Sequence, residues 1–216
     1  MARAVRLASL ALALVLGLGP EPGPAAGAPP PAPSADERQR LAQGEVVYRV
    51  GAPPRDGAVV PGARGAVAFV RVPAAPEAVW AILTQPRRYP EIFPGLRSVE
   101  ILEASADAWL LRTEGKVGPF SFRYHTRYRL HPDERALVWR LDTTRDNDVF
   151  DDNWGGWRLV PEEGGTLVVY AIGSIPSSWQ PLAGFFERRG ITQALAALRD
   201  AAVRRAAAAP AGGAVR

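Results

Sequence analysis

The chain has 216 residues, of which 47% are hydrophobic and 22% charged, as in a globular domain with tails and unlike a disordered protein. It has no cysteine and only two histidines, which excludes disulfides, thiolate metal sites and a cysteine nucleophile, and argues against a polyhistidine site. The net charge of +4 comes from arginine, because Lys116 is the only lysine among 26 basic residues. We therefore expect neither a metal site nor a cofactor.

The N-terminal residues are typical of a secretory signal peptide. Arg3 and Arg6 precede an apolar run over 7–18, and small residues follow. This run is too short to span a bilayer comfortably. We expect residues 1–27 to be removed and the mature protein to be periplasmic or secreted. The alternative is an uncleaved N-terminal membrane anchor.

A linker separates this segment from one domain. Residues 28–43 form a Pro/Ala-rich linker that ends in a short helix, for which Ser34 or Asp36 is the expected N-cap. The domain itself is predicted over 44–208, and residues 209–216 are expected to be a disordered tail.

The first elements of the domain are two strand-like segments and two short helices. Residues 45–50 are strand-like, and β-branched and aromatic residues predict a strand over 66–72. Pro76 suits the first turn of a helix that extends to Thr84, and a second helical turn is expected over 87–93.

Six further strands and a long helix complete the domain. The strands are predicted at 97–103, 108–117, 120–131, 136–142, 154–160 and 166–175, and short turns between them imply antiparallel hairpins. The helix is predicted over 181–208. Only this helix is long enough to cover the apolar face of the sheet. We predict an α+β fold: a curved antiparallel sheet of about seven strands around a long C-terminal helix, with two short helices after the first strand.

The order of elements and the phrase Tyr89-Pro90-Glu91-Ile92-Phe93-Pro94 resemble the START-like (SRPBCC) helix-grip superfamily. Within it, the chain resembles the group of polyketide cyclase/dehydrase and coenzyme Q-binding proteins over residues 65–205. Coenzyme Q-binding members usually continue with Trp-Cys, where this chain has Gly95-Leu96. The resemblance implies a cavity for lipids, quinones, polyketides or other apolar molecules, often without catalysis.

The gap between sheet and helix is the candidate ligand site. Alternation along strand 120–131 points its aromatic residues towards the helix, where hydroxyl tips would enter an apolar chamber. Tyr170 shares a face with Val168 and Ile172, but Leu167 and Val169 make the opposite face of that strand apolar too. The candidate ligand-binding residues are Tyr124, Tyr128, Trp139, Tyr170, Phe185, Phe186, Leu195 and Leu198. In the alternative, these side chains fill a closed core.

The opposite face of strand 120–131 carries a stripe of basic residues. Arg123, Arg127 and Arg129 could contact a membrane surface or an acidic partner, and a solvated sheet face is the plainer interpretation. No recognisable motif supports nucleic-acid binding.

Residues 142–157 are rich in Asp and Asn. The spacing does not fit an EF-hand, because Trp157 stands where the bidentate Glu is needed. The segment is either a turn-rich loop, an ion site, or a gate in which Phe150, Trp154 and Trp157 pack at the cavity mouth.

Catalytic patterns are weak. There is no Gly-x-Ser-x-Gly motif, and His125 falls on the outer face, which separates it from the serines near the last strand. We assign no catalytic residue. The sequence favours an exported carrier for a hydrophobic small molecule. The alternatives are a cyclase or aromatase acting through Tyr, Arg or Asp, and a protein-interaction module with a filled core.

Overall fold

The computed structural model describes residues 32–177 and 188–208. One antiparallel sheet has the strand order β1-β2-β8-β7-β6-β5-β4-β3. Its strands are β1 (Val47–Val50), β2 (Arg64–Val72), β3 (Leu96–Ala104), β4 (Ala108–Val117), β5 (Phe120–His131), β6 (Ala136–Leu141), β7 (Phe150–Glu162) and β8 (Gly165–Pro176). The predicted α+β fold is confirmed, with eight strands where the sequence predicted about seven.

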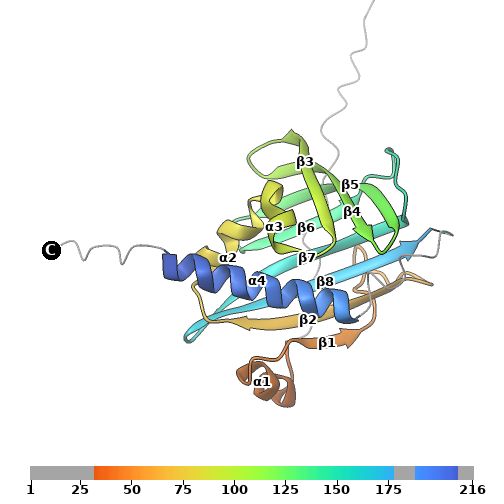
Figure 1. Cartoon of the computed structure of the whole chain (residues 1–216). Helices are drawn as coiled ribbons and strands as arrows, with labels where there is room; N and C mark the ends of the chain where they lie inside the picture. Colours follow the sequence, from red (N-terminus) through yellow and green to blue (C-terminus); the bar gives the residue numbers. More distant parts are fainter. Residues whose placement is uncertain (1–31, 178–187, 209–216) are drawn as a thin grey trace, which may run out of the picture.

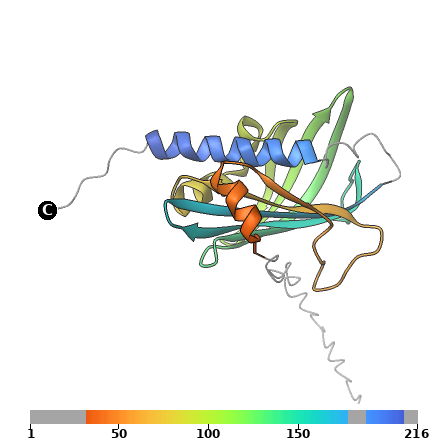
Figure 2. The ribbon, with the colours of Figure 1, turned by 90° about the horizontal axis from the view of Figure 1, so that it is seen from below.

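The helices are α1 (Ala35–Ala42), α2 (Pro76–Leu83), the short 3₁₀ helix η1 (Pro86–Arg88), α3 (Tyr89–Ile92) and α4 (Arg188–Ala208). Figure 1 shows the long blue helix α4 lying across one face of the sheet, with α2 and α3 beside it. Seen from below in Figure 2, α4 forms a separate layer over the strands. Among the described residues, no helix is both long and apolar enough to cross a membrane.

α4 packs on the sheet through residues at helical spacing. Ile191, Leu195, Leu198 and Ala202 are buried and belong to the main core. They contact the inner face of the sheet together with Val79 and Leu83 of α2, so the main core lies between the helices and the sheet. The predicted helix over 181–208 agrees with α4 from Arg188 onward, and its first seven residues lie outside the described part of the chain.

The turn after α2 is fixed by one buried tyrosine and one glycine. The Tyr89 hydroxyl donates to the Leu83 carbonyl at 2.6 Å, which ties α3 back to the end of α2. Gly95 then adopts a φ of +87°, a conformation that favours glycine, and the chain enters β3. The Tyr-Pro phrase of the sequence therefore forms a structural corner beside the sheet.

A second, smaller core lies on the outer face of the sheet, under α1. It consists of the buried side chains of Leu41, Val47, Phe69, Leu167 and Val169. This cluster explains why strand β8 is apolar on both faces: Val168 and Ile172 face the main core, whereas its alternate residues face α1. Ser34 caps α1 and forms a reciprocal capping box with Glu37, which selects Ser34 over Asp36 as N-cap.

Candidate ligand-binding cavity

A cavity of about 390 Å³ lies between the inner face of the sheet and α4. Its volume falls in the range of small-molecule sites. Strands β4 to β8 supply most of the wall, the corner between α3 and β3 supplies one end, and α4 supplies the roof.

Five of the predicted ligand-binding residues line this cavity: Tyr124, Tyr128, Trp139, Tyr170 and Leu195. Leu198 does not line it, because this side chain is fully buried in the main core three residues further along α4. Phe185 and Phe186 lie outside the described residues. The structure thus brings together the sheet side of the predicted site and one residue of its helix side.

The aromatic side chains of the wall form a continuous row. The rings of Trp157 and Tyr170 lie 4.3 Å apart between centroids, those of Tyr170 and Trp139 lie 5.8 Å apart, and Tyr128 continues the row at 5.7 Å from Trp139. Cross-strand pairing sets this arrangement, because Tyr128 is paired with Trp139 and Trp157 with Tyr170. The row makes this part of the wall an apolar aromatic surface.

Three tyrosine hydroxyls provide polar groups in this apolar wall. Burial raises the pKa of Tyr124 to about 12, although hydrogen bonding with Thr113 lowers it in part. Burial also raises the pKa of Tyr128 and of Tyr170, and the neighbouring phenols add to both shifts. All three phenols are therefore protonated at neutral pH and can donate hydrogen bonds to a ligand.

Asn153 is a polar wall residue whose amide is largely engaged. Its Oδ1 accepts a hydrogen bond from Trp139 Nε1 at 2.8 Å, and its Nδ2 donates to the Gly173 carbonyl at 3.3 Å. These bonds fix the indole of Trp139 in the aromatic row. In the sequence, Asn153 is hidden within the Asp-rich segment, and no spacing signal marks it as an inward-facing residue.

Other wall residues were not assigned to the site from the sequence. Phe93 and Leu96 line the cavity from the corner after α3, and Phe93 stacks at 6.0 Å from Trp157. The Tyr-Pro phrase marks this corner but not its proximity to the sheet. Phe150 and Trp157 line the cavity as the gate hypothesis requires, whereas Trp154 points to the outer face and donates to the Pro53 carbonyl at 3.0 Å.

Comparison with known proteins identifies the family. A family model described as polyketide cyclase / dehydrase and lipid transport matches residues 72–199. The chain belongs to this polyketide cyclase/dehydrase and lipid transport family. The predicted resemblance to the START-like superfamily is thereby confirmed. No curated protein matches the chain by sequence.

Solved structures share the fold at low sequence identity. The Zhui aromatase/cyclase from Streptomyces sp. R1128 has a TM-score of 0.62 and 22% identity, covering 70% of this chain and 99% of its own. TTHA0849 from Thermus thermophilus has a TM-score of 0.56 and 16% identity, covering 64% and 96%. A STAR-related lipid transfer protein from Xanthomonas axonopodis has a TM-score of 0.51 and 17% identity, covering 72% and 98%. At these identities, the likeness concerns the fold alone.

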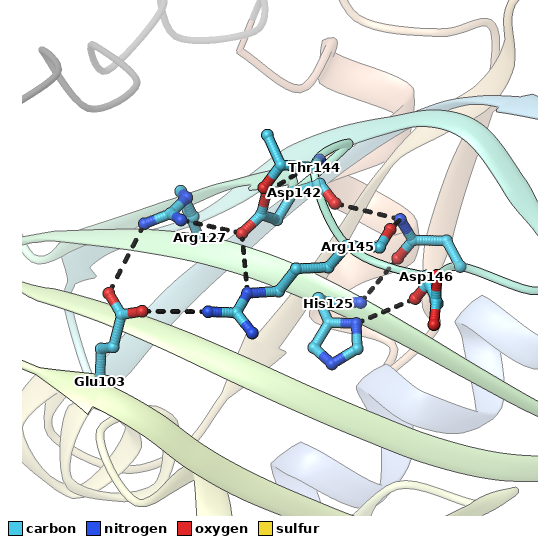
Figure 3. Close-up of polar contacts among 8 residues, drawn as sticks. Glu103, His125, Arg127, Asp142, Thr144, Arg145 and Asp146 are labelled. Atoms are coloured by element: carbon cyan, nitrogen blue, oxygen red, sulfur yellow. Dashed lines mark hydrogen bonds and ion pairs between the residues drawn. The ribbon is translucent and has the colours of Figure 1, made fainter.

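In this member of the family, only residues 142–149 of the Asp-rich segment form a loop, which borders β5 (Figure 3), and residues 150–157 belong to β7. The buried Asp142 accepts hydrogen bonds from the backbone N–H and the hydroxyl of Thr144. Its other oxygen lies 2.9 Å from Arg127 Nη2 and 3.3 Å from Arg145 Nε, as ion pairs without aligned hydrogen bonds. Among the described residues, no group of three His, Asp or Glu side chains is placed to hold a metal ion. The loop is built from turns and side-chain bonds.

His125 lies beneath this loop, on the side of β5 away from the cavity. Its backbone N–H donates to Asn147 Oδ1 at 2.8 Å, and its ring Nδ1 lies 3.0 Å from the Asp146 carbonyl. The ring is buried, although the sequence placed it on a solvated face. The imidazole does not line the cavity, so the described part of the site contains no histidine base.

Two arginines of the basic stripe are neutralised by carboxylates of the same face. Arg127 pairs with Asp142 and lies 3.7 Å from Glu103, and Arg129 pairs with Asp107 at 2.9 Å. The Arg123 side chain is exposed, and its backbone N–H donates to Asp148. Such alternation of charges does not make a cationic membrane-binding surface, and the predicted membrane contact is unsupported.

Proposed function

We propose that this chain binds and carries a hydrophobic small molecule of lipid, quinone or polyketide-like character. The observation that carries the proposal is the cavity beneath α4, with its row of aromatic rings and its three protonated phenols. Removal of apolar surface from water drives such binding, at roughly 25 cal/mol per Å², and the phenols orient the ligand. A cavity of about 390 Å³ weighs against an interaction module with a filled core.

The character of the wall favours binding over catalysis. Among the described residues that line the cavity there is no Asp, Glu or His. The phenols titrate far above neutral pH and are poor general bases there. The alternative function is a cyclase or aromatase, and the observation in its favour is that Tyr124, Tyr128 and Tyr170 can donate protons or hydrogen bonds to a polyketide-like substrate inside the cavity.

Native mass spectrometry of freshly purified protein, followed by solvent extraction, tests the proposal. We expect a co-purified apolar molecule that is released unchanged. The variant Ala194→Phe fills the cavity from α4 and should lose the bound mass. Ala201→Phe is the matched control, because Ala201 is also a half-buried α4 residue packed on the core but does not line the cavity. Conversion of the extracted molecule on incubation with the protein would favour the cyclase instead.

We also propose that the protein is exported. The support is the order of charged, apolar and small residues over 1–27, which lies outside the described residues. N-terminal sequencing of protein recovered from the periplasm or medium should give a start near Ala28. Recovery of an intact Met1 from the membrane fraction would support the anchor alternative.

A further inference from the structure

The cavity has a charged mouth on α4. Arg189 and Gln193 are one helical turn apart, both line the cavity, and both are exposed, whereas Leu195 behind them is fully buried. This gradient of exposure places the mouth at the first described turn of α4. Lys116, the only lysine of the chain, also lines the cavity and is exposed.

The charge of the described cavity lining has a single sign. Arg189 and Lys116 are the charged residues among the described lining, and no described carboxylate lies in the wall. Within the described part of the chain, neither cation takes part in an ion pair, in contrast to Arg127 and Arg129 on the outer face. Cations that have no counter-ion among the described residues attract an anion, and a guanidinium beside an amide can donate several hydrogen bonds to it.

The polar groups deeper in the cavity are suited to the same kind of ligand. The phenols of Tyr124, Tyr128 and Tyr170 can each donate, and the carbonyl oxygen of Asn153 already accepts from Trp139. These phenols can therefore donate hydrogen bonds to acceptor oxygens of a ligand. Full burial of an anion in this apolar interior would be costly, whereas at the exposed mouth the anion retains part of its hydration.

Resting on the proposed binding function, we propose that the ligand is an amphiphilic anion. Its apolar body lies along the aromatic row, and its anionic group is held at the mouth by Arg189 and Lys116. A carboxylate, a sulfonate or a phosphate satisfies this chemistry, whether it belongs to a free acid or to a lipid headgroup.

Two fluorescent probes of the same class test the proposal: 8-anilinonaphthalene-1-sulfonate, which is anionic, and N-phenyl-1-naphthylamine, which is neutral. We expect the full chain to bind both. The double variant Arg189→Gln/Lys116→Gln should bind the anionic probe about five- to tenfold more weakly, because exposed charges contribute modestly to binding. Its affinity for the neutral probe should change less than twofold. Arg204→Gln is the matched control, since Arg204 is exposed on the same helix and does not line the cavity.

Salt dependence gives a second measurement. Raising the salt concentration from about 0.05 to 0.5 M should weaken binding of the anionic probe to the unmodified protein. The same change should weaken its binding to the double variant much less. Displacement of the bound anionic probe by decanoate supports a free acid as ligand, and displacement by phosphatidylglycerol vesicles but not by phosphatidylcholine vesicles supports a lipid headgroup.

Three results would overturn the proposal. If the double variant lost affinity for both probes equally, or for neither, the two cations would not select for a charged ligand. The proposed binding function would still stand. An equal loss of affinity for the anionic probe in Arg204→Gln would mean that the effect comes from the net charge of the protein. Failure of the unmodified, cooperatively folded protein to bind either probe would overturn the binding function as well.

Discussion

At the scale of single residues, the aromatic row depends on a glycine. Gly155 of β7 lies opposite Trp139, and a Cβ built on it would come 2.4 Å from Trp139 Cζ2 and 2.3 Å from the Ala171 carbonyl oxygen. Both approaches are shorter than side chains tolerate, and one of them involves backbone that cannot move freely. The absence of a side chain at Gly155 is what leaves room for the Trp139 indole against the sheet.

Gly155→Ala should therefore lower the free energy of unfolding by about 2–3 kcal/mol, as overpacking does in a rigid interior. It should also weaken binding of the neutral naphthylamine probe, since the Trp139 indole must shift. Urea unfolding and probe titration measure these effects. The neighbouring Gly156→Ala is the control, because its Cβ would meet its nearest atoms at 3.1 and 3.2 Å. Equal losses in the two variants would contradict this account of the row.

The buried phenols give a pH dependence on the alkaline side. The folded pKa of Tyr124 is about 12, above the ordinary value near 10 that applies to the unfolded chain. A raised pKa means that the folded state retains protons that the unfolded state releases. This contribution to stability is thus complete below pH 10 and is lost as the pH rises towards 12.

We expect the free energy of unfolding to fall from pH 10 upward, and Tyr124→Phe to make that fall shallower. Each proton that differs between the two states contributes about 1.4 kcal/mol per pH unit to the slope. Urea unfolding at pH 9, 10 and 11 measures it. Tyr48→Phe is the control, since Tyr48 lies outside the cavity and the charge of Arg188 offsets part of the rise in its pKa that burial causes, so this variant should change the slope less. An unchanged slope in Tyr124→Phe would place this phenol in contact with water.

At the scale of elements, most strands and helices could be predicted, because period-two and helical patterns are local properties of the chain. The pattern predicts a strand over 120–131, which are the bounds of β5. β7 is the exception: it begins at Phe150, four residues before the predicted start. The sequence from 150 to 153 is too polar to indicate a strand, and only pairing with Ile175 and Pro176 of β8 makes it one.

The site was predictable to the extent that it depends on such patterns. Alternation places Tyr124 and Tyr128 on the inner face, and pairing adds Trp139 and Tyr170. The contribution of Asn153 and of the corner at Phe93 could not be predicted, because it depends on which distant segments meet at one end of the cavity. That is a property of tertiary packing and not of any local pattern.

The loop 142–149 takes the place of a neighbouring strand along part of β5. Beyond the end of β6 it supplies the hydrogen bonds that the edge of β5 needs: the Asp142 N–H donates to the His125 carbonyl, and the Asp148 N–H donates to the Arg123 carbonyl, both at 2.9 Å. Asp142, the first residue of this loop, bonds to Thr144 and forms ion pairs with Arg127 and Arg145. Burial raises the pKa of its carboxyl, but the two bonds from Thr144 and the charges of Arg127 and Arg145 lower it more, so the net shift is downward.

Asp142→Asn should cost about 1–2 kcal/mol of unfolding free energy at pH 7, because the ion pairs are lost while their arginine partners keep access to water. Since the folded pKa is depressed, the stability that the carboxylate contributes is present above its ordinary pKa and is lost as the pH falls through the folded value. The difference between the two proteins should therefore shrink in acid. Asp146→Asn is the control, as Asp146 is exposed and contributes its backbone carbonyl. A cost that stays constant down to pH 2 would contradict an electrostatic origin.

At the scale of the whole molecule, the two faces of the sheet are covered unequally. On the outer face, α1 packs Leu41 on four buried side chains of the sheet, and ion pairs cover other parts of this face. On the inner face, α4 closes the main core and also forms the roof of the cavity. Stability and the proposed binding therefore depend on the same helix.

Deletion of residues 181–216 should consequently abolish cooperative unfolding. The deletion removes Ile191, Leu195 and Leu198, each fully or almost fully buried, and exposes their partners on β2 and α2 to water. Each such side chain contributes roughly 1.5–3 kcal/mol through burial alone, so their loss is comparable to the whole stability of a small domain. Deletion of residues 209–216 alone, which leaves α4 intact, is the control and should preserve a sharp thermal transition in circular dichroism. A sharp transition in the longer deletion would mean that the sheet is held by contacts other than α4, and that the cavity roof is separable from the core.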